Sequence, residues 1–225
     1  MATCKTDKFL KAIKVVFANE GGYVNHKDDS GGKTNMGITE ATLKNEVKYG
    51  ITDITDVKKL TRSVCEDIYF EMYWTPCKAE SMKDAISLIH FDNAVNCGTV
   101  TAGKLIQRAI NKVLNANVLV VDGIIGKNTL NYLDKVSATN EMALKFALVY
   151  CDIRDDYYNQ LAINKPKMKV FLKGWHNRIQ HLRDILNSET LVFEVIKEEL
   201  IKIKEKYGDE RKTKIKAAEG EIEVE

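Results

Sequence analysis

The sequence has few residues that interrupt helices or cross-link chains. Only two of its 225 residues are proline, Pro76 and Pro166. Its five cysteines are odd in number and form no C-x-x-C pair, which argues against a disulfide framework. No run of eighteen apolar residues occurs, so no membrane span is expected. These absences predict a helical chain with reduced thiols, made inside the cell.

The N-terminal stretch "MATCKTDKFLKAIKVVFANE" also lacks the features of a secretion signal. Lys11 and Lys14 interrupt its apolar positions, and no small-residue cleavage site follows. We therefore expect synthesis in the cytoplasm without a recognisable signal peptide.

Charge is unevenly distributed along the chain. Residues 189–225 hold eight of the 34 Lys and Arg residues but eleven of the 32 Asp and Glu residues. This leaves 26 basic and 21 acidic residues in 1–188. Such a mildly basic body suits an anionic polymer such as a bacterial cell wall, whereas the bias is too weak to predict nucleic-acid binding.

Hydrophobic periodicity predicts helices over most of residues 6–188. A short β-prone run precedes an Asp122-Gly123 turn, after which Asn128 or Thr129 is expected to cap a helix. There is little room for a sheet, so the expected fold is mainly α. The predicted helices cover residues 6–19, 39–49, 56–74, 83–98, 100–114, a stretch that starts at 127–129, 138–162 and 166–188.

The stretch "FANEGGYVNHKDDSGGKTNMGIT", residues 17–39, combines a carboxyl, paired glycines and a polar loop. Glu20 continues the apolar stripe of the first helix, where burial and the helix C-terminus both raise the pKa of a carboxyl. Asp29 follows in a solvated loop, and Thr34 could hold a water. These groups are the parts that glycoside hydrolysis needs. The residues alone favour a solvated helix end followed by a turn, because turn chemistry explains most of them.

The motif "EGGYVNHKDDSGGKTNMGIT" resembles glycoside hydrolase family 108, a family of peptidoglycan-cleaving N-acetylmuramidases that includes phage endolysins and secretion activators. "IYFEMYW" and "FDNAVNCGTVTAGKLIQRAIN" resemble further family motifs, and "DGIIGKNTL" and "FLKGWHNRIQHLR" resemble its peptidoglycan-binding part. The resemblance covers about residues 6–186. It implies a lysozyme-like helical domain in residues 1–97 and a helical peptidoglycan-binding half in residues 98–188.

The same resemblance assigns roles to residues of this chain. Glu20 is expected to be the general acid, with Asp29 and Thr34 as further catalytic groups. The implied reaction is hydrolysis of the β-1,4 bond between N-acetylmuramic acid and N-acetylglucosamine, and peptidoglycan is the expected partner. The alternative is a non-catalytic, peptidoglycan-binding secretion activator. The residues expected to contact substrate are Tyr23, Asn35, Asn93, Asn96 and Tyr73.

Several groups have more than one interpretation. Asp92 is expected to cap or pair within the core, while Asn93 or Asn96 either satisfies buried partners or lines a sugar cleft. Trp175 is interpreted as a packing residue. The histidines lack ligand spacing, so neither a metal nor a cofactor is implied. Release to the cell wall would be holin-dependent or otherwise non-classical.

The C-terminal segment 189–225 has a different character. Its stretch "VIKEELIKIKEKYGDERKTKI" resembles the coiled-coil tower of the DNA gyrase A subunit over roughly residues 190–223, without that enzyme's catalytic tyrosine region. It is expected to be a charged helix with a frayed acidic end. Weak self-association through Leu191, Val195 and Ile203 is possible, because unburied apolar stripes favour partners.

Overall fold

The computed structural model describes residues 5–20 and 33–188 of the chain. Met1–Arg183 form one compact unit and Asp184–Glu225 a second. The fold is mainly α, as predicted, with a small two-stranded sheet in the described part. Tyr23, Asp29 and the expected charged helix with Leu191, Val195 and Ile203 lie outside the described residues. The expected division of the chain after residues 97 and 188 stays a prediction.

The first elements follow the sequence pattern closely. Helix α1, Asp7–Asn19, begins where the Thr6 hydroxyl accepts a hydrogen bond from the Phe9 N–H at 3.2 Å. Strands β1, Thr34–Asn35, and β2, Ile38–Thr39, form an antiparallel hairpin. Thr39 then caps helix α2, Glu40–Lys48, by accepting from the Thr42 N–H at 3.0 Å. Hydroxyl caps of this kind satisfy N–H groups that have no partner in the first turn of a helix.

The helix predicted over residues 56–74 is divided into three pieces. A 3₁₀ turn η1, Val57–Lys59, precedes α3, Arg62–Tyr69, and the π-helical segment η2, Phe70–Trp74, follows it directly. The division has a local cause, because the Asp56 carboxylate and the Thr61 hydroxyl each cap a new start. A further 3₁₀ turn, η3, covers Ala79–Ser81.

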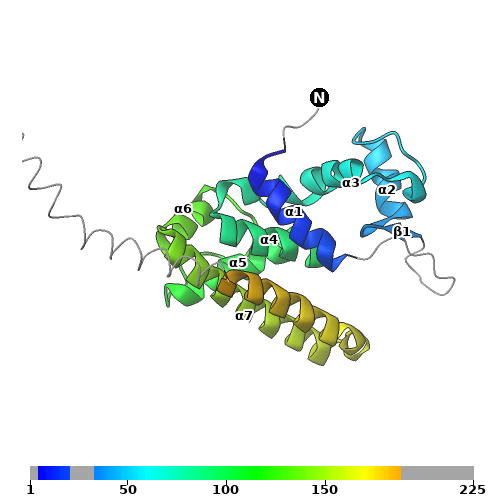
Figure 1. Ribbon diagram of the computed structural model, residues 1–225. Coiled ribbons are helices and arrows are strands. Elements are labelled where there is room, and N and C mark those ends of the chain that lie inside the picture. The colour runs from blue at the N-terminus through cyan, green and yellow to red at the C-terminus, as the bar shows by residue number, and fades with distance from the viewer. Residues whose placement is uncertain (1–4, 21–32, 189–225) are drawn as a thin grey trace, which may run out of the picture. The chain divides into compact units, whose positions relative to one another are not determined.

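Helix α4, Asp84–Cys97, is the centre of the compact unit. Every residue from Ala85 to Ala94 is buried, because α1, α5 (Thr99–Val113) and α7 (Asn140–Asn164) all pack against it (Figure 1). It ends at Gly98, whose φ of 85° is a conformation that favours glycine. The predicted helices 83–98, 100–114 and 138–162 are therefore confirmed.

Helix α6, Lys127–Val136, begins where expected but is capped differently. Its N-cap is Gly126, without a side-chain hydrogen bond, so the expected cap by Asn128 or Thr129 is wrong. Thr129 instead donates its hydroxyl to the Ile124 carbonyl at 3.2 Å, within the preceding loop. The Asp122-Gly123 turn is confirmed, with Gly123 at φ 89°. The β-prone run before it forms no strand in the described structure.

The last part of the compact unit lies along α7 (Figure 1). The 3₁₀ segment η4, Pro166–Phe171, starts at a proline, and helical residues run from 172 to 188. The indole of Trp175 stacks on Tyr158 with 4.7 Å between ring centroids, and Arg183 bonds Asp155 at 2.9 Å. This pairing fixes the face of the helix that carries Arg178. Within the described chain, no helix has the length and apolar content needed to cross a membrane.

Candidate active site

Glu20 stands at the C-terminal end of α1. Its backbone is extended, with φ −93° and ψ 138°, while its N–H still donates to the Val16 carbonyl at 3.1 Å. The side chain is 20% exposed, so most of it is removed from solvent. Such a half-buried carboxyl is what the sequence predicts at this position.

The Glu20 carboxyl is held by a residue that the sequence argument did not include. Its Oε1 accepts a hydrogen bond from Arg178 Nη1 at 2.8 Å, although the two residues are 158 positions apart. The ion pair places a positive charge directly against the carboxyl that the sequence predicts to be the acid.

The turn of the β1–β2 hairpin closes over the other side of Glu20. Met36 and Gly37 both have positive φ, 47° and 76°, which a two-residue type I′ turn requires. A Cβ at Gly37 would lie 2.9 Å from Glu20 Oε2 and would also overlap the Tyr69 hydroxyl. Only glycine leaves this space, so the motif's Gly37 is needed for close packing as well as for the turn.

Two tyrosine hydroxyls accompany the carboxyl. Tyr69 donates to the Met36 carbonyl at 2.9 Å and so anchors the hairpin turn. Tyr73 lies beside it, with ring centroids 5.5 Å apart. Burial, reinforced by the negative charge of Glu20, raises the pKa of both tyrosines above the ordinary value. Both hydroxyls therefore stay protonated, and the one O–H of Tyr69 is already given to the Met36 carbonyl.

Arg178 joins Glu20 to a buried chain of charges. Its Nε donates to Asp92 Oδ1 at 2.8 Å, and Asp92 Oδ2 accepts from Arg154 Nη2, also at 2.8 Å. Asp92 and Arg154 are fully buried. Burial opposes the charge of Arg178, but Asp92 and Glu20 outweigh it and raise the pKa of the guanidinium. The four groups alternate in sign and sum to zero, which is how buried charges are tolerated.

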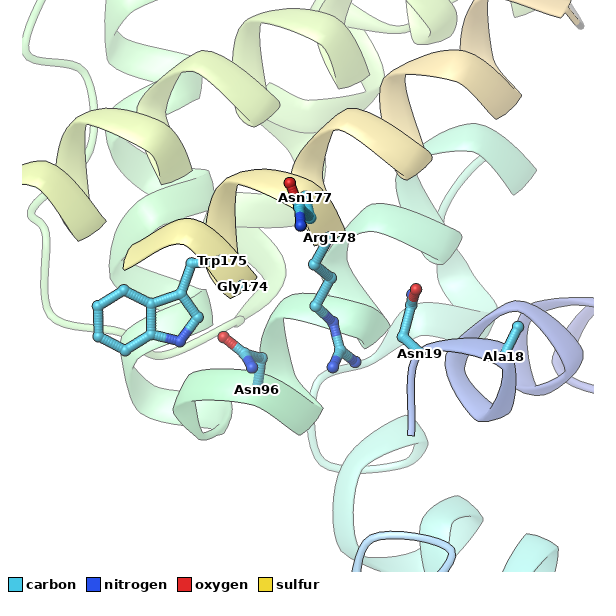
Figure 2. Close-up of a pocket in the computed structure, with 7 residues that line it drawn as sticks. All are labelled: Ala18, Asn19, Asn96, Gly174, Trp175, Asn177 and Arg178. Carbon is cyan, nitrogen blue, oxygen red and sulfur yellow. The ribbon is translucent and has the colours of Figure 1, made fainter. Parts of the chain in front are cut away.

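A pocket of about 390 Å³ lies beside this charge chain. Figure 2 shows the guanidinium of Arg178 between the side chains of Asn19 and Asn96. The wall carries amide groups, one guanidinium and one indole ring, a mixture that suits a polar ligand with an apolar face. The lining residues are Ala18, Asn19, Asn96, Gly174, Trp175, Asn177 and Arg178.

The structure separates the two asparagines expected near the sugar. Asn96 lines the pocket, and its Oδ1 accepts a hydrogen bond from the Tyr158 hydroxyl. The prediction that Asn93 contacts substrate needs correction. Asn93 is fully buried, and its Nδ2 donates to the Tyr150 hydroxyl at 2.8 Å. This places Asn93 in the core between α4 and α7 rather than in the pocket. Asp92 pairs within the core, as one interpretation had it.

The remaining predicted residues have mixed positions. Thr34 pairs with Thr39 in the hairpin, and Asn35 donates its Nδ2 to the Val57 carbonyl at 2.9 Å, a bond that ties the hairpin to η1. Tyr73 stands near Glu20, as described above. Sequence reasoning missed Arg178 and Asn19 and took Trp175 for packing alone. No local pattern marks Arg178, because its partners come from α1 and α4.

The described residues contain no group of three or more His, Cys, Asp or Glu side chains placed to hold a metal ion. The four cysteines with described positions are free thiols, and burial raises the pKa of Cys65, Cys77, Cys97 and Cys151. Buried thiols of this kind stay protonated and are poor nucleophiles.

Comparison with known proteins assigns the family. Residues 13–98 match the model of glycosyl hydrolase 108, and residues 101–180 match a model described as a predicted peptidoglycan domain. The structure of Brucella abortus SagA is 31% identical and has a TM-score of 0.61, covering 80% of this chain and 94% of that one. The chain belongs to the glycosyl hydrolase 108 family, which confirms the resemblance, and its function is related to peptidoglycan.

A second, short similarity links the chain to the DNA gyrase A protein. The gyrase A protein of Halalkalibacterium halodurans is 41% identical over 64 residues, 28% of this chain and 8% of that protein. Its counterpart in Clostridium acetobutylicum is 49% identical over 47 residues, 21% of this chain and 6% of that protein. The chain thus spans less than a tenth of these curated relatives. Both stretches exceed the 34 residues of 190–223, so the similarity includes residues outside the expected range.

Proposed function

We propose that this chain is an N-acetylmuramidase that hydrolyses the β-1,4 bond between N-acetylmuramic acid and N-acetylglucosamine, with Glu20 as the general acid. The observation that carries the proposal is the half-buried Glu20 carboxyl, held by Arg178 beside a pocket lined with amides and an indole. Family membership and the peptidoglycan domain support a wall glycan as the substrate.

The contacts of Glu20 give its two carboxyl oxygens different roles. Oε1 accepts from Arg178, and an oxygen that accepts from a guanidinium is the carbonyl oxygen of the protonated acid. The proton then resides on Oε2 and passes to the glycosidic oxygen as the bond to the anomeric carbon breaks. Tyr69 and Tyr73 remain protonated near the reacting carboxyl, and Tyr69 holds the hairpin turn through its bond to the Met36 carbonyl.

Hydrolysis also needs a second catalytic group that acts at the anomeric carbon. Asp92 is unsuited because it is fully buried and both of its oxygens accept from arginines. Asp29 or Thr34 would position the attacking water if the reaction inverts the configuration. In a retaining reaction, a second carboxyl would stand about 5–5.5 Å from Glu20, against about 6.5–9.5 Å for inversion. The enzyme would act at the cell wall.

The direct test is digestion of purified peptidoglycan, followed by borohydride reduction and mass analysis of the new ends. Wild-type protein should produce reduced N-acetylmuramic acid, and Glu20→Gln should lower the rate by about two to four orders of magnitude. Glu141→Gln makes the same change at a partly exposed glutamate of α7 and should keep the wild-type rate. Wall binding without new reducing ends would overturn the proposal in favour of a binding protein. Equal cleavage rates for wild type and Glu20→Gln would overturn the role of Glu20 as the general acid.

A further inference from the structure

Two of the residues that line the pocket beside Glu20 carry buried N–H donors that have no hydrogen-bond acceptor among the described residues. They are Nη2 of Arg178 and Nδ2 of Asn19. The Arg178 side chain is only 10% exposed, so water does not easily replace a missing partner. Nearly all buried polar groups in native proteins are paired, and an unpaired donor is costly. Two such donors in one pocket indicate a ligand that supplies acceptor oxygen.

The other bonds of these two residues are already fixed. Arg178 gives Nη1 to Glu20 and Nε to Asp92, while Asn19 Oδ1 faces His181 Nδ1 at 3.0 Å. Neither side chain can turn to find a partner without breaking these contacts. The two N–H groups are therefore preorganised, which lowers the entropy cost of holding a ligand.

The donors that remain select between the two kinds of acceptor oxygen that a wall glycan offers. Arg178 already gives Nε to Asp92 and Nη1 to Glu20, so it has no paired fork of N–H groups left for a bidentate carboxylate. A neutral carbonyl oxygen needs neither a fork nor a counter-charge, and its two lone pairs can accept from both donors.

The rest of the wall fits a carbonyl that bears a methyl group. Trp175 has one ring face stacked on Tyr158, so the indole is held in place. With Ala18 it supplies the apolar surface of a pocket whose other lining side chains are amides and a guanidinium. A methyl group buried against such an aromatic surface leaves water favourably.

We infer that this pocket binds the N-acetyl group of an N-acetylamino sugar. The acetyl carbonyl accepts hydrogen bonds from Arg178 and Asn19, and the acetyl methyl rests on Trp175. The inference rests on the proposed function, because Arg178 links the pocket to Glu20 and so relates the bound sugar to the acid. N-acetylation of the glycan then becomes a requirement for recognition.

Binding can be measured without any cleavage of the wall. Wild-type protein is titrated with a tetramer of N-acetylglucosamine, with its fully N-deacetylated form, and with that form chemically re-acetylated. Tryptophan fluorescence reports the event, since Trp74 is 1% exposed in the core and Trp175 lines the pocket. We expect at least tenfold tighter binding of the two acetylated tetramers, and loss of the signal in Trp175→Phe.

A matched pair of variants tests the assigned donor. Asn19→Asp retains the oxygen that faces His181 and replaces the unpartnered N–H₂ with an acceptor, so affinity should fall about three- to tenfold. Asn131→Ala removes an exposed amide from α6 and should bind as the wild type does. Equal affinity for acetylated and deacetylated tetramers would overturn the inference, and so would unchanged affinity in folded Asn19→Asp.

A parallel digestion of normal and N-deacetylated peptidoglycan separates this inference from the proposed function. Equal cleavage of both walls would overturn the N-acetyl requirement while leaving the muramidase proposal intact. Binding that depends on N-acetylation and on Asn19, with neither wall cleaved, would support the pocket assignment and overturn the muramidase proposal. The comparison of tetramers uses wild-type protein, so it stands even if a variant fails to fold.

Discussion

The two family-matched parts of the chain contribute opposite charges to one site. Residues 13–98 supply the carboxylates Glu20 and Asp92, and residues 101–180 supply the guanidinium groups of Arg154 and Arg178. The first part contains the E-G-G motif, but it leaves both acids without their cations. The difference shows that the candidate active site is a property of the two parts packed together, although the family description assigns hydrolysis to only one.

The largest expected effect on the contact between the two parts comes from replacing Arg154, the arginine that is wholly buried. Arg154→Met would leave Asp92 in the core with Arg178 as its one remaining cationic partner. Breaking a buried ion pair from one side costs about 3–5 kcal/mol in the free energy of unfolding. Denaturant unfolding at neutral pH measures this loss.

Arg183→Met provides the matched control. Arg183 also bonds two aspartates, Asp152 at 2.7 Å and Asp155 at 2.9 Å, but those carboxylates are partly exposed. Its loss should cost about 1 kcal/mol or less, as solvated ion pairs contribute little. If Arg154→Met were no more destabilising than Arg183→Met, the buried charge chain would not be what joins the two parts.

A second contact between the parts makes stability depend on pH. His90 of α4 is fully buried and bonds the Tyr150 hydroxyl of α7 at 2.9 Å. Burial, with the Arg154 guanidinium adding, lowers the pKa of His90 to about 3 from an ordinary value of 6.5. Between these values the unfolded chain binds a proton that the native chain does not. The stability of the fold should therefore fall by a few kcal/mol as pH drops from 6.5 toward 3.

The measurement is the free energy of unfolding at pH 7 and pH 4 for wild type and His90→Gln. Gln can still bond Tyr150 but does not titrate, so its loss of stability between the two pH values should be smaller. Carboxylates titrate alike in both proteins, and the difference between the slopes isolates His90. Identical slopes would mean that His90 is protonated at its native position.

A smaller effect is expected when a glycine of the first part is replaced by alanine. Two such glycines separate the effect of backbone strain from the effect of contact with the catalytic carboxyl. Gly37 and Gly50 have nearly the same φ, 76° and 74°, so alanine at either position costs about 1–2 kcal/mol of stability. Only at Gly37 would the new methyl meet Glu20 and Tyr69, while Gly50 faces open space. Gly37→Ala should therefore lower wall cleavage about ten- to a hundredfold, since a displaced catalytic group loses rate steeply.

Gly50→Ala should cleave the wall at close to the wild-type rate, measured at equal concentrations of folded protein. Equal activity of the two variants would show that the hairpin turn does not position Glu20. Loss of activity in both would indicate that backbone strain alone, rather than contact with the acid, controls the site.

Local sequence patterns were sufficient to predict most of the fold. Helices such as α1 and α4 were predictable because apolar spacing, a hydroxyl cap and a terminal glycine agree on their limits. The predicted helix over 56–74 was divided because Asp56 and Thr61 compete as caps inside one apolar pattern. The wrong cap for α6 has a similar origin, because Thr129 bonds back to its own loop.

The site was predictable only where its residues are close in sequence. Glu20 stands out because the apolar stripe of α1 ends at a carboxyl before two glycines. Arg178 has no such signal, since its partners Glu20 and Asp92 are 158 and 86 positions away. Asn93 and Asn96 could not be distinguished by type, because three positions on a helix place one in the core and the other at a pocket.

The smallest expected effect concerns residues 189–225, which belong to neither family match. If residues 13–98 and 101–180 together form the active site, a chain that ends at Ser188 should cleave peptidoglycan at the wild-type rate. Its free energy of unfolding should change by less than about 1 kcal/mol, because the sequence predicts a charged helix there, and isolated helices are marginal. Paired thermal melts and digestions of the full and shortened chains measure both quantities. A loss above about 2 kcal/mol, equal to deleting a buried side chain, would show that the segment is integrated into the fold.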